Sequence, residues 1–509
     1  MTGLTAAAAE WVQDEQVHPV LIRKEVNPFL RVRIVADAPA RLRSLTFTLE
    51  GTDDLQDLEL VEVLAGSTPS ANLPAARFGG ALAASPRVVF RGDLALSPGT
   101  NVLWLSTRLR ESAALNHRVA ARCVGVEADT GPMPETAGSM SAPARHRIGV
   151  ALRKAFDEGV HTHRIPVLAT TGAGTLLAAY DLRRLDSGDL QGDIDIGLSR
   201  SVDGGRRWEA PRVIMDMGEF GGLPQVQNGC SDPGILVDRQ TGEIFVFALW
   251  VHGKPGQHQW RNRGSEPGFE VGKTAQLLVV RSTDDGKTWS RPENLTRALK
   301  KQSWWLFATA PQQGIQLEDG TLIMPAQGRD DTGYPFATFF HSRDHGAHWT
   351  VGTPAYSGGN ECQAAALSDG SILLNVRNDR NRSRAVFSTS DLGQSWRQHS
   401  SHETLIEPNC NASLISLTYK HAGQSRRALL FCNPRSTTAR THQTLQVSFD
   451  DGRTWPESHR FLVDEGRGAG YPSLSRVDDD HIGLVYEGSQ AQIVFERFSL
   501  KELGLLNPP

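Results

Sequence analysis

The chain has 509 residues, with 53 Lys and Arg against 57 Asp and Glu and a formal net charge of −4. This balance lacks the basic excess of a nucleic-acid-binding protein, and the length predicts two or three domains. Gly (49 residues) and Pro (27 residues) punctuate short β-rich runs while helical periodicity is scarce, so we expect an all-β protein.

The sequence gives no indication of a membrane anchor or a metal centre. No apolar run approaches the roughly 20 residues that span a bilayer. The first nine residues lack the basic and apolar regions of a signal peptide. The five Cys residues are scattered and odd in number, without metal-ligand spacing or a disulfide framework. We therefore expect buried thiols, no metal and no other cofactor.

The first part of the chain predicts a β-sandwich. Leu45, Phe47 and Leu49 alternate with threonines, as in a half-buried strand, and residues 88–90 and 102–105 predict two more strands. Residues 128–146 are rich in Pro, Gly and Ser and predict a linker. Residues 1–146 are thus interpreted as a sandwich plus linker, with either a structural role or carbohydrate binding.

The second part, residues 147–509, repeats the phrase Ser/Thr-x-Asp-x-Gly-x-x-Trp five times. Its Asp can accept backbone N–H groups within a turn, its Gly supplies a positive φ, and its Trp buries apolar surface against a sheet. Such repeats predict radial four-stranded units, and the roughly 360 residues suit a six-bladed β-propeller. The five copies lie at 201–208, 282–289, 342–349, 389–396 and 448–455.

Because the Asp and Gly of each repeat are needed for turn geometry, functional residues are expected between the repeats. The irregular stretch 251–272 predicts a loop near a site. The segment His163-Arg164-Ile165-Pro166 precedes the first repeat. Together with the repeats, it resembles the exo-α-sialidase (neuraminidase) family over residues 150–509. The first domain resembles the β-sandwich that precedes the catalytic domain in some bacterial sialidases.

The resemblance implies a group of arginines that binds the substrate. Arg164, Arg377 and Arg440 correspond to the three arginines that hold the carboxylate of a sialic acid. Converging guanidinium groups suit a carboxylate because they form charge-assisted, partly bidentate hydrogen bonds. Arg183 resembles a fourth arginine that assists the carboxylate or the 4-hydroxyl, and Asp232 resembles the contact to the 4-hydroxyl.

The resemblance also implies three catalytic residues. Tyr471 corresponds to the nucleophile, Glu361 to the glutamate that activates it, and Asp189 to the acid/base, 25 positions after Arg164. A raised pKa would suit Asp189 to this role. Its rivals on the same segment are Asp186, Asp193 and Asp195, of which the last two alternate with isoleucines and are expected to face outward from a strand.

The sequence departs from the family in two places. Pro472 follows the expected nucleophile where related bacterial proteins more often have Ser, and the stretch 310–314 has Gln residues where some relatives carry Gly-Arg or Gly-Asn. Trp250, Trp304 and Trp305 could line a pocket for an N-acetyl group or belong to the core.

We therefore expect a retaining exo-α-sialidase that acts on sialylated glycans, glycoproteins or glycolipids through a tyrosyl-sugar intermediate. Three alternatives remain: a trans-sialidase, a hydrolase that prefers the deaminated sugar, and a non-catalytic propeller that binds sugars. We expect a monomer. The family resemblance implies a secreted or periplasmic location, although no signal peptide is visible.

Overall fold

The computed structural model describes residues 9–66, 76–136, 142–143, 145–252 and 264–506. The chain divides into two compact units, Met1–Ala151 and Leu152–Pro509. Both consist mainly of strands, which confirms the all-β prediction. In the described residues, no helix is both long and apolar enough to cross a membrane. The predicted linker, 128–146, lies at the end of the first unit, and its residues 137–141 and 144 are outside the described part.

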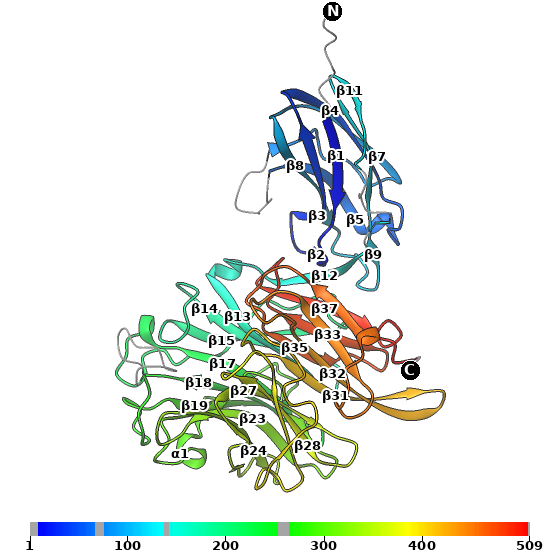
Figure 1. The fold of residues 1–509 in the computed structure, drawn as a ribbon. Helices are drawn as coiled ribbons and strands as arrows, with labels where there is room; N and C mark the ends of the chain where they lie inside the picture. Colours follow the sequence, from blue (N-terminus) through cyan, green and yellow to red (C-terminus); the bar gives the residue numbers. More distant parts are fainter. Residues whose placement is uncertain (1–8, 67–75, 137–141, 144, 253–263, 507–509) are drawn as a thin grey trace, which may run out of the picture. The chain divides into compact units, whose positions relative to one another are not determined.

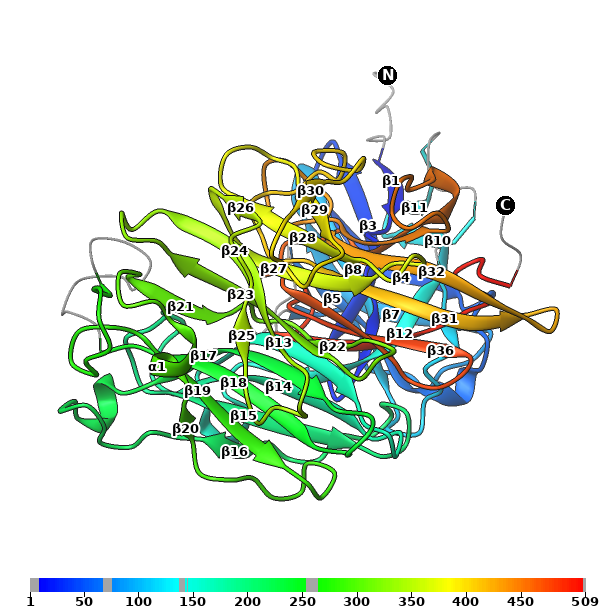
Figure 2. The same ribbon diagram turned by 90° about the horizontal axis from the view of Figure 1, so that it is seen from below.

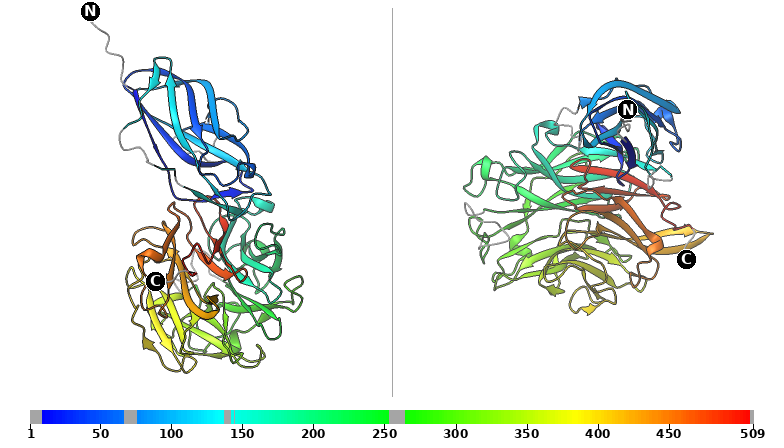
Figure 3. Two further views of the ribbon diagram at one scale, coloured as in Figure 1. Left: turned by 90° about the vertical axis from the view of Figure 1, so that its right-hand side faces the viewer. Right: turned by 45° about the horizontal axis from the view of Figure 1, so that its top comes forward.

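The first unit contains two antiparallel sheets, drawn mainly in blue and cyan in Figure 3. In β4, Leu45 and Phe47 are buried while Thr46 and Thr48 are half-buried, as their alternation predicts. One sheet has the order β1 (Ala9–Asp14), β3 (Asn27–Ala36), β8 (Gly99–Leu109), β5 (Leu58–Ala65) and β6 (Ala76–Arg77), and the other β11 (Gly131–Met133), β10 (Arg122–Ala128), β4 (Ala40–Thr48) and β7 (Arg87–Leu96).

Four more elements belong to the first unit or begin in it. The 3-10 turn η1 (Leu55–Asp57) leads into β5. Strand β12 (His146–Arg153) pairs in parallel with β2 (Val20–Ile22) and antiparallel with β9 (Arg118–Val119).

The second unit is a series of sheets in which strands that follow each other in sequence are neighbours (Figure 1). The first three sheets are β13 (Thr162–Thr170), β14 (Leu176–Arg183), β15 (Ile194–Ser201), β16 (Arg212–Met215); β17 (Cys230–Val237), β18 (Ile244–Trp250), β19 (Gln276–Ser282), β20 (Glu293–Asn294); and β21 (Leu306–Thr309), β23 (Leu322–Arg329), β24 (Pro335–Ser342), β25 (Thr350–Val351), with β22 (Ile315–Gln316) and β26 (Tyr356–Ser357) beside them.

Three more sheets follow in the same manner. They are β27 (Gly359–Ala366), β28 (Ile372–Asn378), β29 (Ala385–Thr389), β30 (Arg397–Gln398); β31 (Ser413–His421), β32 (Gln424–Pro434), β33 (Gln443–Ser448), β34 (Arg460–Asp464); and β35 (Pro472–Arg476), β36 (His481–Tyr486), β37 (Ile493–Ser499). The helical turns are α1 (Thr296–Leu299), η2 (Asp157–Gly159), η3 (Gln225–Gln227) and η4 (Glu457–His459).

The core of this unit lies between successive sheets. One buried cluster contains Leu198 of β15 and Val246 of β18, and the next contains Phe247 of β18 and Phe340 of β24. The first and last sheets also meet, because the backbone N–H of Leu168 in β13 donates to Ser473 Oγ in β35 over 3.0 Å. Figure 2 shows the sheets following one another around a common centre. This is a β-propeller, and its sheets favour the predicted count of six blades.

The five repeats form the predicted turns. In the first, Ser201 Oγ donates to Asp203 Oδ1 and accepts from the N–H of Gly205, both over 3.0 Å. The same two hydrogen bonds occur in the other four copies. The glycine has a positive φ in each copy, between 75° and 88°. Hydrogen bonds from Thr288 lower the pKa of Asp284 in the second copy. The repeat aspartates are therefore engaged in turn structure.

Candidate active site

Irregularities near the start of three strands direct polar side chains to one place. Pairing shifts in β13 at residues 164–167, in β17 at 231–234 and in β27 at 359–362. Ile165 and Asp232 have φ values of 55° and 61°, which are rare outside glycine. A β-bulge bends a strand and re-aims its side chains. These three bulges carry Arg164, Asp232 and Glu361.

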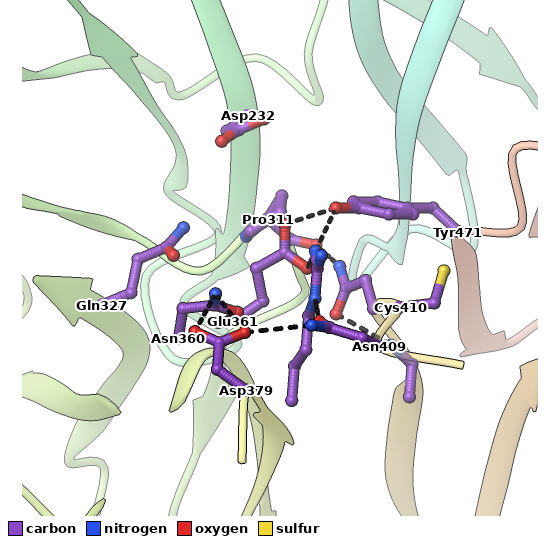
Figure 4. A network of polar contacts seen from close by, with 12 residues as sticks. Asp232, Pro311, Gln327, Asn360, Glu361, Asp379, Asn409, Cys410 and Tyr471 are labelled. Carbon is purple, nitrogen blue, oxygen red and sulfur yellow. Dashed lines mark hydrogen bonds and ion pairs between the residues drawn. The ribbon is translucent and has the colours of Figure 1, made fainter. Parts of the chain in front are cut away.

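A phenol and a carboxylate form the centre of the site (Figure 4). Tyr471 Oη donates to Glu361 Oε1 over 2.5 Å, and each residue is 6% exposed. Burial raises the pKa of Tyr471 well above its usual value, and the charge of Glu361 adds to this effect, whereas Arg377 and Arg440 oppose it. At neutral pH the phenol is thus protonated, with its proton aimed at a carboxylate that can accept it.

Three arginines surround this phenol. Arg377 Nη1 donates to Tyr471 Oη over 2.9 Å and to Glu361 Oε2 over 2.8 Å. The guanidinium carbons of Arg164 and Arg440 each lie 5.4 Å from the centroid of the Tyr471 ring. The structure therefore brings together, from three different sheets or their loops, all three arginines that the sequence pointed to. Such a group of cations suits an anionic ligand with a carboxylate.

A carboxylate that the sequence analysis missed holds this arrangement together. Glu487, whose side chain is 2% exposed, accepts from Arg164 Nε over 2.9 Å and from Arg164 Nη2 over 3.2 Å. It also accepts the backbone N–H groups of Ile165 and Tyr471. One side chain thus fixes the first arginine, its bulge and the position of the phenol. The only indication in the sequence is an acidic residue directly after the apolar strand 481–486.

Glycine is required next to the phenol. Gly470 has a φ of 91°, and a Cβ at this position would lie 3.0 Å from Pro434 Cγ and 3.1 Å from Arg440 Cβ. The guanidinium of Arg440 donates to the carbonyl of Ala469 over 2.8 Å. The Gly-flanked sequence around Tyr471 therefore lets the third arginine approach closely.

Asp189 lies on the loop between β14 and β15, with a side chain that is 41% exposed. Arg183 Nη1 donates to Asp189 Oδ1 over 2.7 Å and to the carbonyls of Ser187 and Gly188, each over 2.9 Å. Arg164 Nη1 is 3.6 Å from Asp189 Oδ1. Arg183 itself is 1% exposed, so a buried guanidinium holds this loop in place. Its expected contact with a sugar stays a prediction.

Asp232 lies apart from the hydrogen bonds of Tyr471 and Glu361 in Figure 4. Its backbone N–H donates to Asp181 Oδ1 over 3.1 Å, and Asp181 also binds Arg183 over 3.0 Å. Burial, together with the neighbouring Asp181, raises the pKa of Asp232 well above its usual value. Its role toward the 4-hydroxyl likewise stays a prediction.

The rivals of Asp189 have other partners. Asp186 Oδ1 accepts the N–H of Gly188, and Asp193 Oδ1 accepts from Gln225. The prediction that Asp195 faces outward was wrong: it is 3% exposed and bonds Arg184 Nη2 over 2.6 Å. Strand β15 lies inside its sheet and is buried along its whole length, so alternation does not separate inside from outside. Burial raises the pKa of Asp195 to about 6.

Of the three tryptophans, two belong to the core. Trp250 and Trp304 are buried in clusters between sheets, and Trp250 Nε1 donates to Asn228 Oδ1. Trp305 Nε1 donates to the carbonyl of Asp331. Half of the predicted loop 251–272 falls on residues 253–263, which lie outside the described part.

The two departures from the family pattern touch each other. Gln312 Nε2, in the stretch 310–314, donates to the carbonyl of Pro472 over 2.9 Å. The neighbouring Pro311 carbonyl accepts from Asn411, whose Oδ1 accepts from Gln363. This chain of buried amides therefore supports the backbone that carries Tyr471.

A buried ion pair supports the second arginine. Arg384 Nη1 lies 2.9 Å from Glu407 Oε2, both side chains are 0% exposed, and Glu407 Oε1 accepts the N–H of Asn378, next to Arg377. We expect Glu407→Gln to lower the free energy of unfolding by about 3–5 kcal/mol, because it leaves a buried guanidinium without its counter-charge. Urea denaturation of the full chain measures this.

A surface pair is the control for this stability prediction. Glu318, whose side chain is 96% exposed, pairs with Arg427 over 3.4 Å, so Glu318→Gln is expected to cost less than about 1 kcal/mol. Equal losses in the two variants would contradict a structural role for the buried pair.

Comparisons with known proteins show the family of this chain. Residues 174–486 match the model of the BNR repeat-like domain, and residues 8–132 match the N-terminal domain of BNR-repeat neuraminidase. The chain is 37% identical to a sialidase of Bacteroides fragilis, over 98% of this chain and 96% of that protein. It is 35% identical to the sialidase of Micromonospora viridifaciens, over 69% of this chain and 54% of that protein.

Solved structures give the same result. The Hadza microbial sialidase Hz136 has a TM-score of 0.88 and 35% identity, with 96% of this chain and 99% of that chain covered. The fold also resembles that of Trypanosoma rangeli sialidase, at a TM-score of 0.58 and 21% identity over 70% of this chain and 60% of that one. Fold and site together define a glycoside hydrolase with a β-propeller. The chain belongs to the BNR-repeat neuraminidase family, the sialidases.

Proposed function

We propose that this protein is an exo-α-sialidase that releases terminal sialic acids from sialylated glycoconjugates with retention of configuration. The observation that carries the proposal is the hydrogen bond from Tyr471 to Glu361 inside the ring of three arginines. A sialic acid has its carboxylate on the anomeric carbon, so the arginines that bind this group would place the reacting carbon beside the phenol.

The charge of the substrate explains a tyrosine in this position. A carboxylate nucleophile would be repelled by the substrate carboxylate next to the reacting carbon, whereas a neutral phenol is not. Sialidases are known exceptions to the usual carboxylate nucleophile of glycosidases. The raised pKa of Tyr471 means that it needs a base during attack, and Glu361 is in hydrogen-bonding contact with it.

The proposed reaction has two displacements. First, Tyr471 Oη bonds to the anomeric carbon, its proton passes to Glu361, and the glycosidic bond breaks as Asp189 protonates the leaving oxygen. Second, water attacks the same carbon, Asp189 takes its proton, and the bond to Tyr471 breaks, with Glu361 returning the proton. Two inversions give net retention. The arginines stabilise a cationic transition state whose carboxylate they already hold.

The experiment that tests the reaction class is hydrolysis of a fluorogenic sialoside, with the product followed by NMR. The proposal predicts the α-anomer as the first product, before mutarotation. The β-anomer as first product contradicts a double displacement. Transfer to a galactoside acceptor would be seen in the same spectra as a new sialoside and would mark a trans-sialidase.

The role of Asp189 predicts a dependence on the leaving group. Asp189→Asn cannot protonate the departing oxygen, so hydrolysis of 3′-sialyllactose is expected to fall by about 10²–10⁴-fold. An aryl sialoside with an acidic phenol needs little protonation and is expected to lose much less in the first step. Steady-state rates on both substrates measure this; equal losses would contradict the assignment.

The remaining expectations are part of the proposal. We propose a monomer that is secreted or periplasmic, with a first unit that is either structural or carbohydrate-binding. Size-exclusion chromatography with light scattering tests the monomer. Binding of the full chain to a glycoprotein before and after removal of its sialic acid separates substrate binding from binding by the first unit.

A further inference from the structure

A second cavity in the propeller unit has no residue in common with the arginine-ringed site. It encloses about 230 Å³ beside the sheet β31–β34 and is lined by three arginines, Arg435, Arg453 and Arg460, and by the apolar side chains of Leu405 and Trp455. Pockets for drug-sized ligands measure roughly 300–1,000 Å³. This cavity therefore suits a compact ligand.

The cavity has more positive charge than its own residues neutralise. Among the described residues, the guanidinium groups of Arg435 and Arg453 make no hydrogen bond or ion pair. Arg460 uses Nη1 to bind Glu457 Oε1 over 2.8 Å and Nη2 to bind the carbonyl of Trp455 over 2.9 Å. Its Nε is buried without a partner. The lining residues include no carboxylate.

Burial and mutual repulsion make it unfavourable to hold these cations together without an anion. Burial lowers the pKa of Arg435 and the charge of Arg460 lowers it further, whereas the charge of Glu457 opposes this shift. A partly buried cation that makes no ion pair loses hydration, and Glu457, which bonds Arg460, compensates Arg435 only in part. An anion would relieve the repulsion and accept the free N–H groups in charge-assisted hydrogen bonds.

We propose that this cavity binds a tetrahedral oxyanion, a sulfate or phosphate group, through Arg435 and Arg453, with the Nε of Arg460 as a third donor. A tetrahedral ion presents oxygens in several directions, which suits cations that come from different segments of the chain. The apolar walls formed by Leu405 and Trp455 leave room for the carbon atoms of an ester, such as a sulfated sugar. The proposal is independent of the hydrolytic reaction.

Titration calorimetry at constant ionic strength tests the site, with sodium sulfate, sodium phosphate and galactose 6-sulfate as probes. We expect saturable binding by the full chain and a Kd at least tenfold higher in the double variant Arg435→Gln/Arg453→Gln. The control Arg426→Gln removes an exposed arginine that bonds Gln424, and it is expected to leave Kd unchanged. Tighter binding of galactose 6-sulfate than of sulfate identifies a glycan ester as the ligand; equal or weaker binding identifies the free ion.

A second measurement separates binding from structure. Because Arg435 is repelled in the empty cavity, Arg435→Gln is expected to keep or raise Tm in chloride buffer and to lose the rise in Tm that sulfate gives the unaltered chain. Hydrolysis of a small fluorogenic sialoside is expected to stay unchanged. No saturable binding by the unaltered chain, equal Kd in the double variant, or a lower Tm of Arg435→Gln without anion would each overturn the proposal.

Discussion

Replacement of Tyr471 by Phe is expected to lower kcat by at least about 10³-fold, as removal of a catalytic nucleophile commonly does. The variant keeps the ring between Arg164 and Arg440 but loses the oxygen that bonds Glu361 and Arg377. The arginines remain, so binding of the sugar is expected to persist. Hydrolysis of an aryl sialoside, together with the affinity for free sialic acid, measures both effects.

The chain contains a matched control for this change. Tyr486 Oη donates to Glu496 Oε1 over 2.9 Å, in a second buried pair of the same kind, and both residues are 0% exposed. Tyr486→Phe removes the same hydroxyl from a comparable environment, so its effect on Tm reports the structural cost alone. Full activity of Tyr471→Phe would rule out its role as nucleophile. A loss of activity in Tyr486→Phe as large as in Tyr471→Phe would show that loss of stability explains both.

The second large effect is expected for Glu361→Gln. The amide has nearly the same shape but cannot take the phenol proton, and the raised pKa of Tyr471 leaves the phenol protonated at neutral pH. We expect kcat to fall by about 10²–10⁴-fold, the range of general base catalysis. KM is expected to change less, because two of the three arginines, Arg164 and Arg440, do not bond the Glu361 carboxylate directly. Steady-state kinetics from pH 5 to 10 measures both parameters.

The pH dependence adds a specific test of Glu361→Gln. Without the base, attack requires phenolate, so the residual activity is expected to rise with pH toward the pKa of Tyr471. A pH profile of the same shape as that of the unaltered chain, with only a small loss of kcat, would contradict a base at this position.

Much of the fold could be predicted because short stretches of sequence specify its turns. The phrase around Asp203 and Gly205 specifies a hydrogen-bonded turn in eight residues, and the structure contains it five times. The repeats therefore predicted the propeller without any long-range information. Side-chain alternation predicted strand β4 of the first unit for the same reason, since one face of its sheet is buried.

The site was predictable only in part. The resemblance named Arg164, Arg377, Arg440, Glu361 and Tyr471, and the structure brings these five together. It could not indicate the groups that position them, because these contacts join segments far apart in the chain. Glu487 is 323 residues from Arg164, which it binds.

Local patterns also failed where burial is decided by packing. The alternation around Asp195 indicated an exposed face, but neighbouring strands and sheets cover both faces of β15. The bulges that aim Arg164, Asp232 and Glu361 depend on pairing register, which no short motif reveals. The hydrogen bond from Gln312 to the Pro472 carbonyl could not be predicted either. Each of the two departures from the family pattern, taken alone, gives no indication of the other.

The central claim is a covalent bond between Tyr471 and the sugar, and trapping tests it most directly. A 2,3-difluorinated sialic acid has a good leaving group at the anomeric carbon, and its second fluorine slows breakdown of the intermediate by destabilising a cationic transition state. Trypsin cuts after Arg467 and Arg476, so the peptide Gly468–Arg476 contains Tyr471 and no Asp or Glu. We predict that mass spectrometry finds the fluorosialyl adduct on this peptide, on Tyr471. An adduct on another peptide, such as the one with Glu361, would contradict the account.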